Sequence, residues 1–340
     1  MFKRTTLQDI AQATSLTPSA VSKALSNHPG MSEATKEMVR KKAKELNYQQ
    51  NKIALSLRTG KSKIIGVIIP SAEKNFFGSV VHGLEKIITA NNYNLLLFQT
   101  NELKEFEQRA IETFIYSGVE CIIASPAKED LNLKHYIELK KRNTPLILFD
   151  RADTSIEIPS VTIDDFAGGF NATEHLIEKG YTRIAHIGGL QNIKIFKERL
   201  LGYQEALRKH HLPINKNLIV YGKNSIESGK ACTQQLIDSK EAFDAIFAIE
   251  DFTALGAMQA LKQNNIKIGK EVGLIGFANE SFGEYISPSL STVDQQTIRM
   301  GEEIGNLFFK LIKKENFYEG PTERIILQPV LIERESTNRG

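Results

Sequence analysis

The chain has 340 residues, of which 41% are apolar and 24% are charged. This balance excludes wholesale disorder and a collagen-like fold, and the length predicts two or three domains. No apolar run reaches the roughly 18 residues of a membrane span, and the first residues lack an apolar signal core, so we expect a cytoplasmic protein without a membrane partner. Cys121 and Cys232 lie far apart, which argues against a disulfide framework and suits a reducing compartment.

The net charge of +3 conceals an uneven distribution along the chain. Residues 1–63 carry twelve Lys and Arg side chains against four acids, a net charge of +8, and the remainder carries −5. A small basic module joined to a larger, mildly acidic body is the charge pattern of a nucleic-acid-binding arm. A solvated basic face without a partner is the alternative interpretation.

Three short helices are predicted in the basic module. The first begins after Thr6, which with Asp9 fits a capping signature, because the hydroxyl accepts orphan backbone N–H groups and the acid favours the positive helix end. Thr17 then caps a second helix with Pro18 at its first position, where a missing N–H costs nothing. A third helix opens at Ser32. The side chains expected on the inner faces are Leu7, Ile10, Ala11, Val21, Ala24, Leu25, Val39, Ala43 and Leu46.

Two short helices joined by a tight turn, with a third as a brace, form a helix-turn-helix, whose second helix enters the major groove of DNA. Ser19 and Ser22 can donate or accept hydrogen bonds there, and Ala20 can contact a thymine methyl group. Lys23 can reach a guanine edge or a phosphate. A three-helix bundle without a ligand is the alternative, and the charge of +8 counts against it.

Segments 6–11, 17–25, 32–36 and 46–48 closely resemble the headpiece of the LacI family of bacterial repressors. The family usually has Arg where this chain has Lys23, and an ammonium group is a point donor rather than a bidentate fork. The resemblance implies a set of DNA-contacting residues in the three helices and the segment that follows them. They are Thr6, Leu7, Thr17, Pro18, Ser19, Ala20, Ser22, Lys23, Asn27 and Tyr48.

Residues 51–58 are long enough for two helical turns, although an isolated helix of this length is unstable in water. They resemble the family's hinge helix, which orders only on operator DNA. In that interpretation Leu57 wedges between base steps and kinks the duplex, and Ala54 permits close approach. Asn51 and Arg58 would contact the backbone or the groove. The alternative is a linker whose leucines pack on the body.

From residue 64 onward, apolar strands alternate with amphipathic helices, which predicts doubly wound parallel sheets. About eight strands fall in two runs with a break at 162–164, so we expect two similar lobes with a cleft between them. The expected strands are 64–69, 94–98, 120–124 and 146–149 in the first run and 183–187, 218–221, 245–249 and 272–275 in the second. The expected helices are 76–91, 104–117 and 131–142 in the first run and 166–179, 196–210, 226–238, 252–264 and 296–313 in the second.

This body resembles the LacI-family core, which is itself similar to a type I periplasmic sugar-binding protein. The implied fold is an α/β protein with a three-helix headpiece and a hinge helix, followed by two doubly wound α/β lobes. Its expected domains are a helix-turn-helix DNA-binding headpiece at 1–50, a hinge helix and linker at 51–63, and a two-lobed effector-binding and dimerisation core at 64–340.

Ligands of such sheets bind beyond the carboxyl ends of the strands. Phe76 and Phe77 follow the first strand and resemble a family aromatic pair, with Phe76 able to stack on a flat or sugar-like ligand. Asp150 ends a strand and can take ligand hydroxyls, and Arg199 aligns with the family's ligand-gripping arginine, whose fork suits paired hydroxyls or a carboxylate. For each residue, a structural ion pair or helix cap is the alternative. Further family ligand positions are occupied by Asn224, Glu250 and Gln295.

Three positions depart from the family pattern. Glu250 stands where Asn is frequent, Ala278 replaces a frequent Asp, and Ile195 stands where a polar residue is common. The ligand therefore cannot be copied from a well-known relative.

The sequence lacks a Gly-x-Ser-x-Gly elbow and a metal-spaced cysteine pair, so we expect no catalytic residue, metal or cofactor. We predict a homodimeric, sequence-specific DNA-binding transcriptional regulator, a repressor by family default, whose effector is a small molecule of the carbohydrate class. Its partner is near-palindromic double-stranded operator DNA, because a two-fold dimer reads two half-sites. The alternatives are a solute-binding protein that uses only the cleft and an enzyme on small molecules with a DNA-binding arm.

Overall fold

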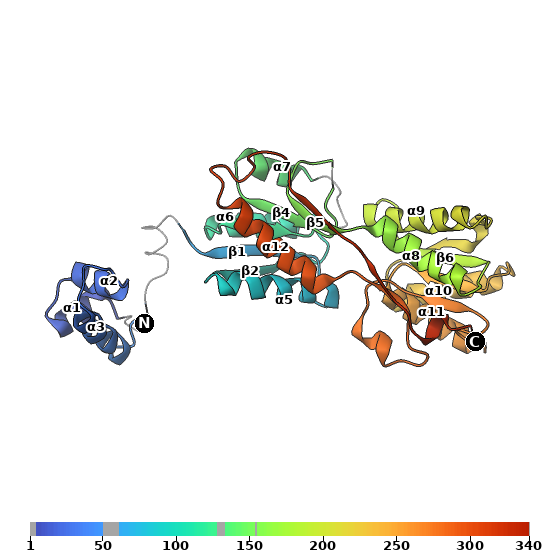
Figure 1. Cartoon of the computed structure of the whole chain (residues 1–340), viewed down its shortest axis with the longest axis horizontal. Coiled ribbons are helices and arrows are strands. Elements are labelled where there is room, and N and C mark those ends of the chain that lie inside the picture. Colours follow the sequence, from blue (N-terminus) through green and yellow to red (C-terminus); the bar gives the residue numbers. More distant parts are fainter. Residues whose placement is uncertain (1–4, 50–60, 128–132, 154, 340) are drawn as a thin grey trace. The chain divides into compact units, whose positions relative to one another are not determined.

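The computed structural model describes residues 5–49, 61–127, 133–153 and 155–339 (Figure 1). The chain divides into two compact units, a headpiece unit of Met1–Ser62 and a core unit of Lys63–Gly340. Within the described ranges, no helix has both the length and the apolar character that crossing a bilayer requires.

The headpiece unit is built from three capped helices. They are α1 (Leu7–Thr14), α2 (Pro18–Leu25) and α3 (Glu33–Glu45). Thr6 forms a complete capping box with Asp9: the Thr6 hydroxyl accepts from the Asp9 backbone N–H at 3.3 Å, and the Asp9 carboxylate accepts from the Thr6 N–H at 2.7 Å. Thr17 accepts from the Ala20 N–H at 3.2 Å, and Ser32 caps α3. The three predicted helix starts are therefore confirmed.

A small apolar core holds these helices together. Each side chain that was expected inside contributes to it. The fully buried members are Ile10, Ala11, Val21, Ala24, Val39 and Ala43, and the partly buried ones include Leu7, Leu25 and Leu46. Because these residues are few and small, the headpiece core has little reserve against a buried polar substitution.

The first lobe of the core unit contains a six-stranded parallel sheet in the order β11-β5-β4-β3-β1-β2. Its strands are β1 (Ile64–Ile69), β2 (Asn94–Gln99), β3 (Cys121–Ala124), β4 (Leu146–Phe149), β5 (Ser160–Ile163) and β11 (Arg324–Leu327). Its helices are α5 (Asn75–Ala90) and α12 (Thr297–Leu311) on one face and α6 (Lys104–Tyr116) and α7 (Lys134–Lys141) on the other. Ile65 and Val67 of β1 pack on the α5 face, whereas Ile68 packs on the α6 face. Because helices cover both faces of the sheet, β1 is apolar almost throughout.

The second lobe contains a four-stranded parallel sheet in the order β7-β6-β8-β9. Its strands are β6 (Ile184–Gly188), β7 (Ile219–Tyr221), β8 (Ala245–Ala248) and β9 (Gly273–Ile275). Its helices are α8 (Asp165–Glu178) and α9 (Lys194–Lys209) on one face and α10 (Ile226–Asp238) and α11 (Asp251–Gln263) on the other. A separate antiparallel pair joins β10 (Thr292–Asp294) to β12 (Val330–Ile332). The short 3₁₀ helices are η1 (Lys216–Leu218), η2 (Ser281–Glu284) and η3 (Glu335–Thr337).

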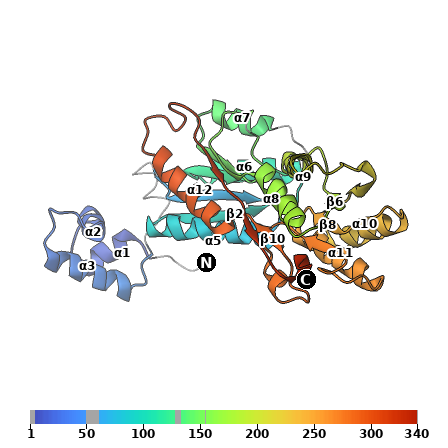
Figure 2. The same ribbon diagram turned by 45° about the vertical axis from the view of Figure 1, so that its right-hand side comes forward.

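The α/β class and the two lobes are confirmed, but the expected division into two consecutive runs is wrong. The expected break at 162–164 overlaps β5, a strand of the first sheet, and helix 297–311 belongs to the first lobe rather than the second. The chain therefore passes between the lobes three times, after β5, after β10 and after β11. The red α12 accordingly lies beside the cyan α5 in both views (Figure 1 and Figure 2).

Two glycines explain how closely α5 and α12 pack. A Cβ atom on Gly83 would lie 2.0 Å from the Ile298 carbonyl oxygen, and one on Gly301 would lie 2.0 Å from the Val80 carbonyl oxygen. The apolar stripe of α12 was visible in the sequence, but helical periodicity does not identify the sheet that a helix covers. The described ranges also hold four strands beyond the eight expected, namely β5, β10, β11 and β12, each of only three or four residues.

Candidate functional site

Helix α2 presents a surface of short side chains at its N-terminal end. Thr17, Pro18 and Ser19 are exposed there, and Lys23 is exposed one turn later. The opposite face is anchored by Val21, which is fully buried. A helix that is anchored by buried side chains on one face and carries short side chains on the other can bring its backbone close to the base edges of a DNA groove.

The remaining residues of the predicted DNA surface have mixed environments. Ala20 and Ser22 are half-buried rather than fully outward. Leu7 packs against the headpiece core, and Tyr48 does the same, with burial raising the pKa of its hydroxyl. Asn27 is exposed and accepts a hydrogen bond from Arg40 at 3.1 Å. These positions stay predictions as DNA contacts.

The predicted hinge contacts cannot be placed in the same way. All four lie outside the described residues, and their roles stay predictions. They are Asn51, Ala54, Leu57 and Arg58.

A cleft in the core unit collects six of the seven predicted effector residues. Phe76 and Phe77 lie in the first turn of α5, Asp150 directly follows β4, and Arg199 comes from α9. Glu250 precedes α11 and Gln295 follows β10, so both lobes contribute to the lining. Asn224, half-buried between β7 and α10, is not among the residues that line this cleft, and its role stays a prediction.

The cleft has an open outline but little free space inside. Its total empty volume, counted out to the mouth, is about 410 Å³. The part of that volume that a water-sized molecule can occupy is only about 30 Å³. That interior volume holds one or two waters. A ligand of sugar size therefore requires the lining side chains to turn aside or the lobes to separate.

Arg199 is the most constrained side chain of the cleft. Only 1% of its surface is exposed, and its Nε donates to Asp165 Oδ1 at 2.8 Å. Its terminal nitrogens donate to the Ile249 carbonyl at 2.8 Å and to Gln295 Oε1 at 3.4 Å. The guanidinium also stacks on Phe277, with its central carbon 3.6 Å from the ring centroid. Arg199 is therefore held in one orientation before any ligand binds.

The first lobe supplies a second guanidinium. Arg151 donates to both oxygens of Glu102, at 2.7 and 3.1 Å, and its Nε lies 3.5 Å from Asp150. Asp150 adopts a left-handed φ of 61° at the end of β4 and accepts from the Ser125 hydroxyl at 3.2 Å. This wall presents one carboxylate to the cleft beside a guanidinium that is already paired.

The second lobe supplies a carboxylate wall. Lys74 Nζ, from the first lobe, lies 3.5 Å from Glu250 Oε2. Glu280 is 7% exposed, and its backbone N–H donates to Asp251 at 2.7 Å. Burial raises the pKa of Glu280 to about 7, and the neighbouring carboxylates of Asp251 and Glu250 push the pKa in the same direction. Burial likewise raises the pKa of Asp251 to about 6.

Sequence reasoning missed several lining residues. Lys74, Arg151, Phe252 and Glu280 line the cleft without having been selected, together with two of the noted departures from the family pattern. Glu280 follows β9 by five residues, so the rule that ligands bind beyond strand ends could have found it. Lys74 follows β1 by five residues and satisfies the same rule, but its approach to Glu250 is visible only in the folded chain. The two positions that depart from the family pattern and also line the cleft are Ile195 and Ala278.

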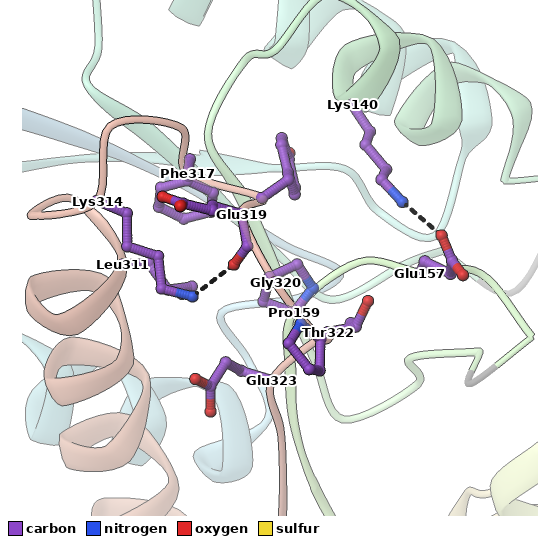
Figure 3. A pocket seen from close by; sticks show the side chains of 12 residues that line it. Lys140, Glu157, Pro159, Leu311, Lys314, Phe317, Glu319, Gly320, Thr322 and Glu323 are labelled. Carbon is purple, nitrogen blue, oxygen red and sulfur yellow. Dashed lines mark hydrogen bonds and ion pairs between the residues drawn. The ribbon is translucent and has the colours of Figure 1, made fainter.

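A second hollow lies in the first lobe near the end of α12, and the part of it that a water-sized molecule can occupy measures about 140 Å³ (Figure 3). Lys140 donates to Glu157 at 3.1 Å, and Lys314 donates to the Glu319 carbonyl at 2.8 Å. Lys140 thus has a carboxylate partner and Lys314 a backbone partner, and we assign the hollow no ligand.

Comparisons with known proteins agree with both parts of this geometry. The family model "Bacterial regulatory proteins, lacI family" matches residues 6–51, and the model "Periplasmic binding proteins and sugar binding domain of LacI family" matches residues 62–333. The HTH-type transcriptional regulator RegA of Clostridium saccharobutylicum is 30% identical over 337 residues, which cover 98% of this chain and 99% of RegA.

Solved structures show the same likeness. The complex of the transcriptional regulator CelR with cellobiose is 26% identical, with a TM-score of 0.74 and coverage of 98% of this chain and 100% of CelR. A Lac repressor dimer bound to operator is 22% identical, with a TM-score of 0.87 and coverage of 99% and 100%, and this likeness concerns the fold alone. The chain therefore belongs to the LacI family of bacterial regulatory proteins, as a DNA-binding transcriptional regulator with a helix-turn-helix headpiece and a periplasmic-binding-protein-like core.

Proposed function

We propose that the protein is a homodimeric repressor that acts in the cytoplasm on near-palindromic operator DNA. A sugar or sugar derivative bound in the cleft changes its affinity for that DNA, and the cleft binds this ligand without converting it. The observation that carries the proposal is helix α2, whose capped N-terminal end exposes Ser19 and Lys23 while Val21 is fully buried on the other side.

Electrostatics support DNA as the partner. Lys36 and Lys42 are paired with Glu33 and Glu45, at 2.7 and 2.5 Å. The module of residues 1–63 nevertheless has a net charge of +8, so it attracts the phosphate backbone, and binding should weaken steeply as salt rises.

The cleft supports a carbohydrate effector. Phe76 and Phe252 provide aromatic surface, and Asp150 and Gln295 provide oxygen and amide groups for hydroxyls. This mixture of apolar walls with a few placed polar groups is typical of small-molecule sites. CelR, a structural relative over nearly the whole chain, was solved with cellobiose.

Substitution of Lys23 tests whether α2 contacts operator DNA. We expect Lys23→Ala to weaken binding to a selected operator by about 5- to 150-fold, because a lost base or phosphate contact costs about 1–3 kcal/mol. Fluorescence anisotropy across a salt series measures the effect. Lys41→Ala is the matched control, since Lys41 is also an exposed lysine of the headpiece but lies on α3. Equal losses in the two variants would contradict a role for α2 in reading base pairs.

Strand β2 supports the homodimer. It is an edge strand of the first sheet, and Leu96 and Leu97 are 38% and 48% exposed on it. An apolar edge with unpaired backbone groups is suited to pairing with a second chain. We therefore propose that β2 belongs to the dimer interface.

Leu97→Asp is expected to shift the protein from dimer to monomer in sedimentation velocity, because it places a charge in the proposed interface. Operator affinity should fall with it, since one headpiece reads only one half-site. Ile326→Asp is the control, on β11 at the opposite edge of the same sheet, where Ile326 is 53% exposed. A Leu97→Asp protein that remains dimeric would exclude β2 from the interface.

A further inference from the structure

The cleft holds its guanidinium groups against carboxylates of the protein itself. Its lining contains three cations, Lys74, Arg151 and Arg199, and three carboxylates, Asp150, Glu250 and Glu280. Behind them, Glu102 pairs with Arg151, Asp165 pairs with Arg199, and Asp251 accepts from the Glu280 backbone N–H. An anionic ligand would therefore enter a site whose two guanidinium groups already have carboxylate partners.

Neither guanidinium group can bind an anionic ligand without giving up or sharing the carboxylate with which it is already paired. Arg199 is paired with Asp165 at 2.8 Å, and Arg151 is paired with Glu102 at 2.7 and 3.1 Å. A uronate or phosphate would have to compete with carboxylates that the protein itself has already placed. The cleft therefore favours neutral or cationic ligands.

The carboxylate wall of the second lobe receives its positive charge from across the cleft. Lys74 Nζ lies 3.5 Å from Glu250, which is longer than the roughly 2.7–2.9 Å of a close charged hydrogen bond. The same lysine is the cation that acts on the buried Glu280. The ammonium of Lys74, loosely paired with Glu250, thus marks a place where the cleft stabilises a positive charge, and Glu280 lines the same space.

Aromatic rings line the same space. Phe76 comes from the first lobe and Phe252 from the second. The C–H face of a pyranose ring can pack on such rings, and a nearby ammonium group is also attracted to aromatic faces. The cleft accordingly combines surfaces for a sugar ring with carboxylates for a positive charge.

Resting on the function proposed above, we propose that the effector is an amino sugar, whose protonated amino group takes the place of the Lys74 ammonium between Glu250 and Glu280. The sugar ring packs between the aromatic side chains, and its hydroxyls bind Asp150, Arg199 and Gln295.

Isothermal titration calorimetry of the full chain tests this proposal. The probes are glucosamine, galactosamine and mannosamine, each with its parent hexose, its N-acetyl form and its uronate. We expect one amine to bind at least about tenfold more tightly than the three matched sugars, a difference of about 1.4 kcal/mol. A hexose or uronate that binds as tightly as its amine, or the absence of binding by all three amines, would overturn the proposal.

Two variants sharpen the test. Glu280→Gln should reduce the amine's preference over its parent hexose by about tenfold, while Lys74→Met should strengthen amine binding because a competing ammonium is removed. Glu157→Gln, in the hollow of Figure 3, removes a carboxylate paired with lysine outside the cleft and should change neither affinity. Unchanged preference in both cleft variants would contradict the proposed position of the amine.

The pH dependence of amine binding tests the role of Glu280 in the unmodified protein. Amine binding should tighten between about pH 5.5 and 7, where the sugar amine is still mostly protonated, because Glu280, whose pKa burial raises to about 7, gains charge over that range. Asp251, Glu250, Lys74 and Asn75 are the groups that act on the Glu280 carboxyl group.

If a neutral hexose binds instead and alters operator affinity, the proposed function stands and the amino-sugar proposal fails. If operator binding responds to no sugar, the proposed carbohydrate control fails.

Discussion

Replacing Arg199 with methionine is expected to lower the free energy of unfolding of the core unit by about 3–5 kcal/mol at neutral pH. Arg199 is 1% exposed and Asp165 is 6% exposed, so the substitution leaves a buried carboxylate without its cation. Urea denaturation followed by circular dichroism measures the change. The loss should shrink as the pH falls below about 7, because burial raises the pKa of Asp165 to about 7 even beside Arg199, and without that cation the carboxyl group takes up a proton more readily.

Two further variants identify the cause of that loss. The double variant Arg199→Met with Asp165→Asn should recover part of the stability, since it removes the uncompensated charge. Lys209→Met is the matched control on the same helix, because Lys209 pairs with Glu174 at 2.8 Å but is 57% exposed. Exposed ion pairs contribute about 0–1 kcal/mol. An Arg199→Met protein no less stable than Lys209→Met would contradict a structural role for this arginine.

Replacing Val21 with aspartate is expected to abolish operator binding while leaving the core unit folded. Val21 is fully buried in a headpiece core of small side chains, and a buried unpaired charge costs several kcal/mol. A core of this size has too little stability to absorb that cost. Gel-shift titration measures the loss of binding, and a preserved thermal transition of the core unit shows that the effect is local.

Met38→Asp controls for the added negative charge. Met38 is 44% exposed on α3, so the same charge change there should weaken DNA binding only modestly. Intact operator affinity in the Val21→Asp protein would show that the folded headpiece is not the DNA-binding unit.

Much of the fold could be predicted because individual segments carry unambiguous local signals. Thr17 and Pro18 mark the start of α2, and the apolar run of Ile64–Ile69 indicates a buried strand. The return of α12 and β11 to the first lobe could not be predicted. Its cause is packing between distant segments, such as the contact of Gly83 with Ile298, which leaves no periodic signature in either segment.

The site was predictable to the extent that its residues follow strand ends or match the family pattern. Phe76, Asp150 and Arg199 satisfy one of these conditions, and they line one cleft. The charge state of the carboxylate wall could not be predicted from the sequence. It depends on the burial of Glu280 and on the approach of Lys74 to Glu250 from the other lobe. Those relations exist only in the folded core unit.

Paired headpieces that read duplex DNA through α2 should select a two-fold symmetric site. Selection of DNA from a random duplex library by the full-length protein measures this preference. We expect enriched sequences that share one inverted repeat with a fixed half-site spacing. Recovery of unrelated sequences, or of a single site without two-fold symmetry, would show that the headpieces do not act as a symmetric pair.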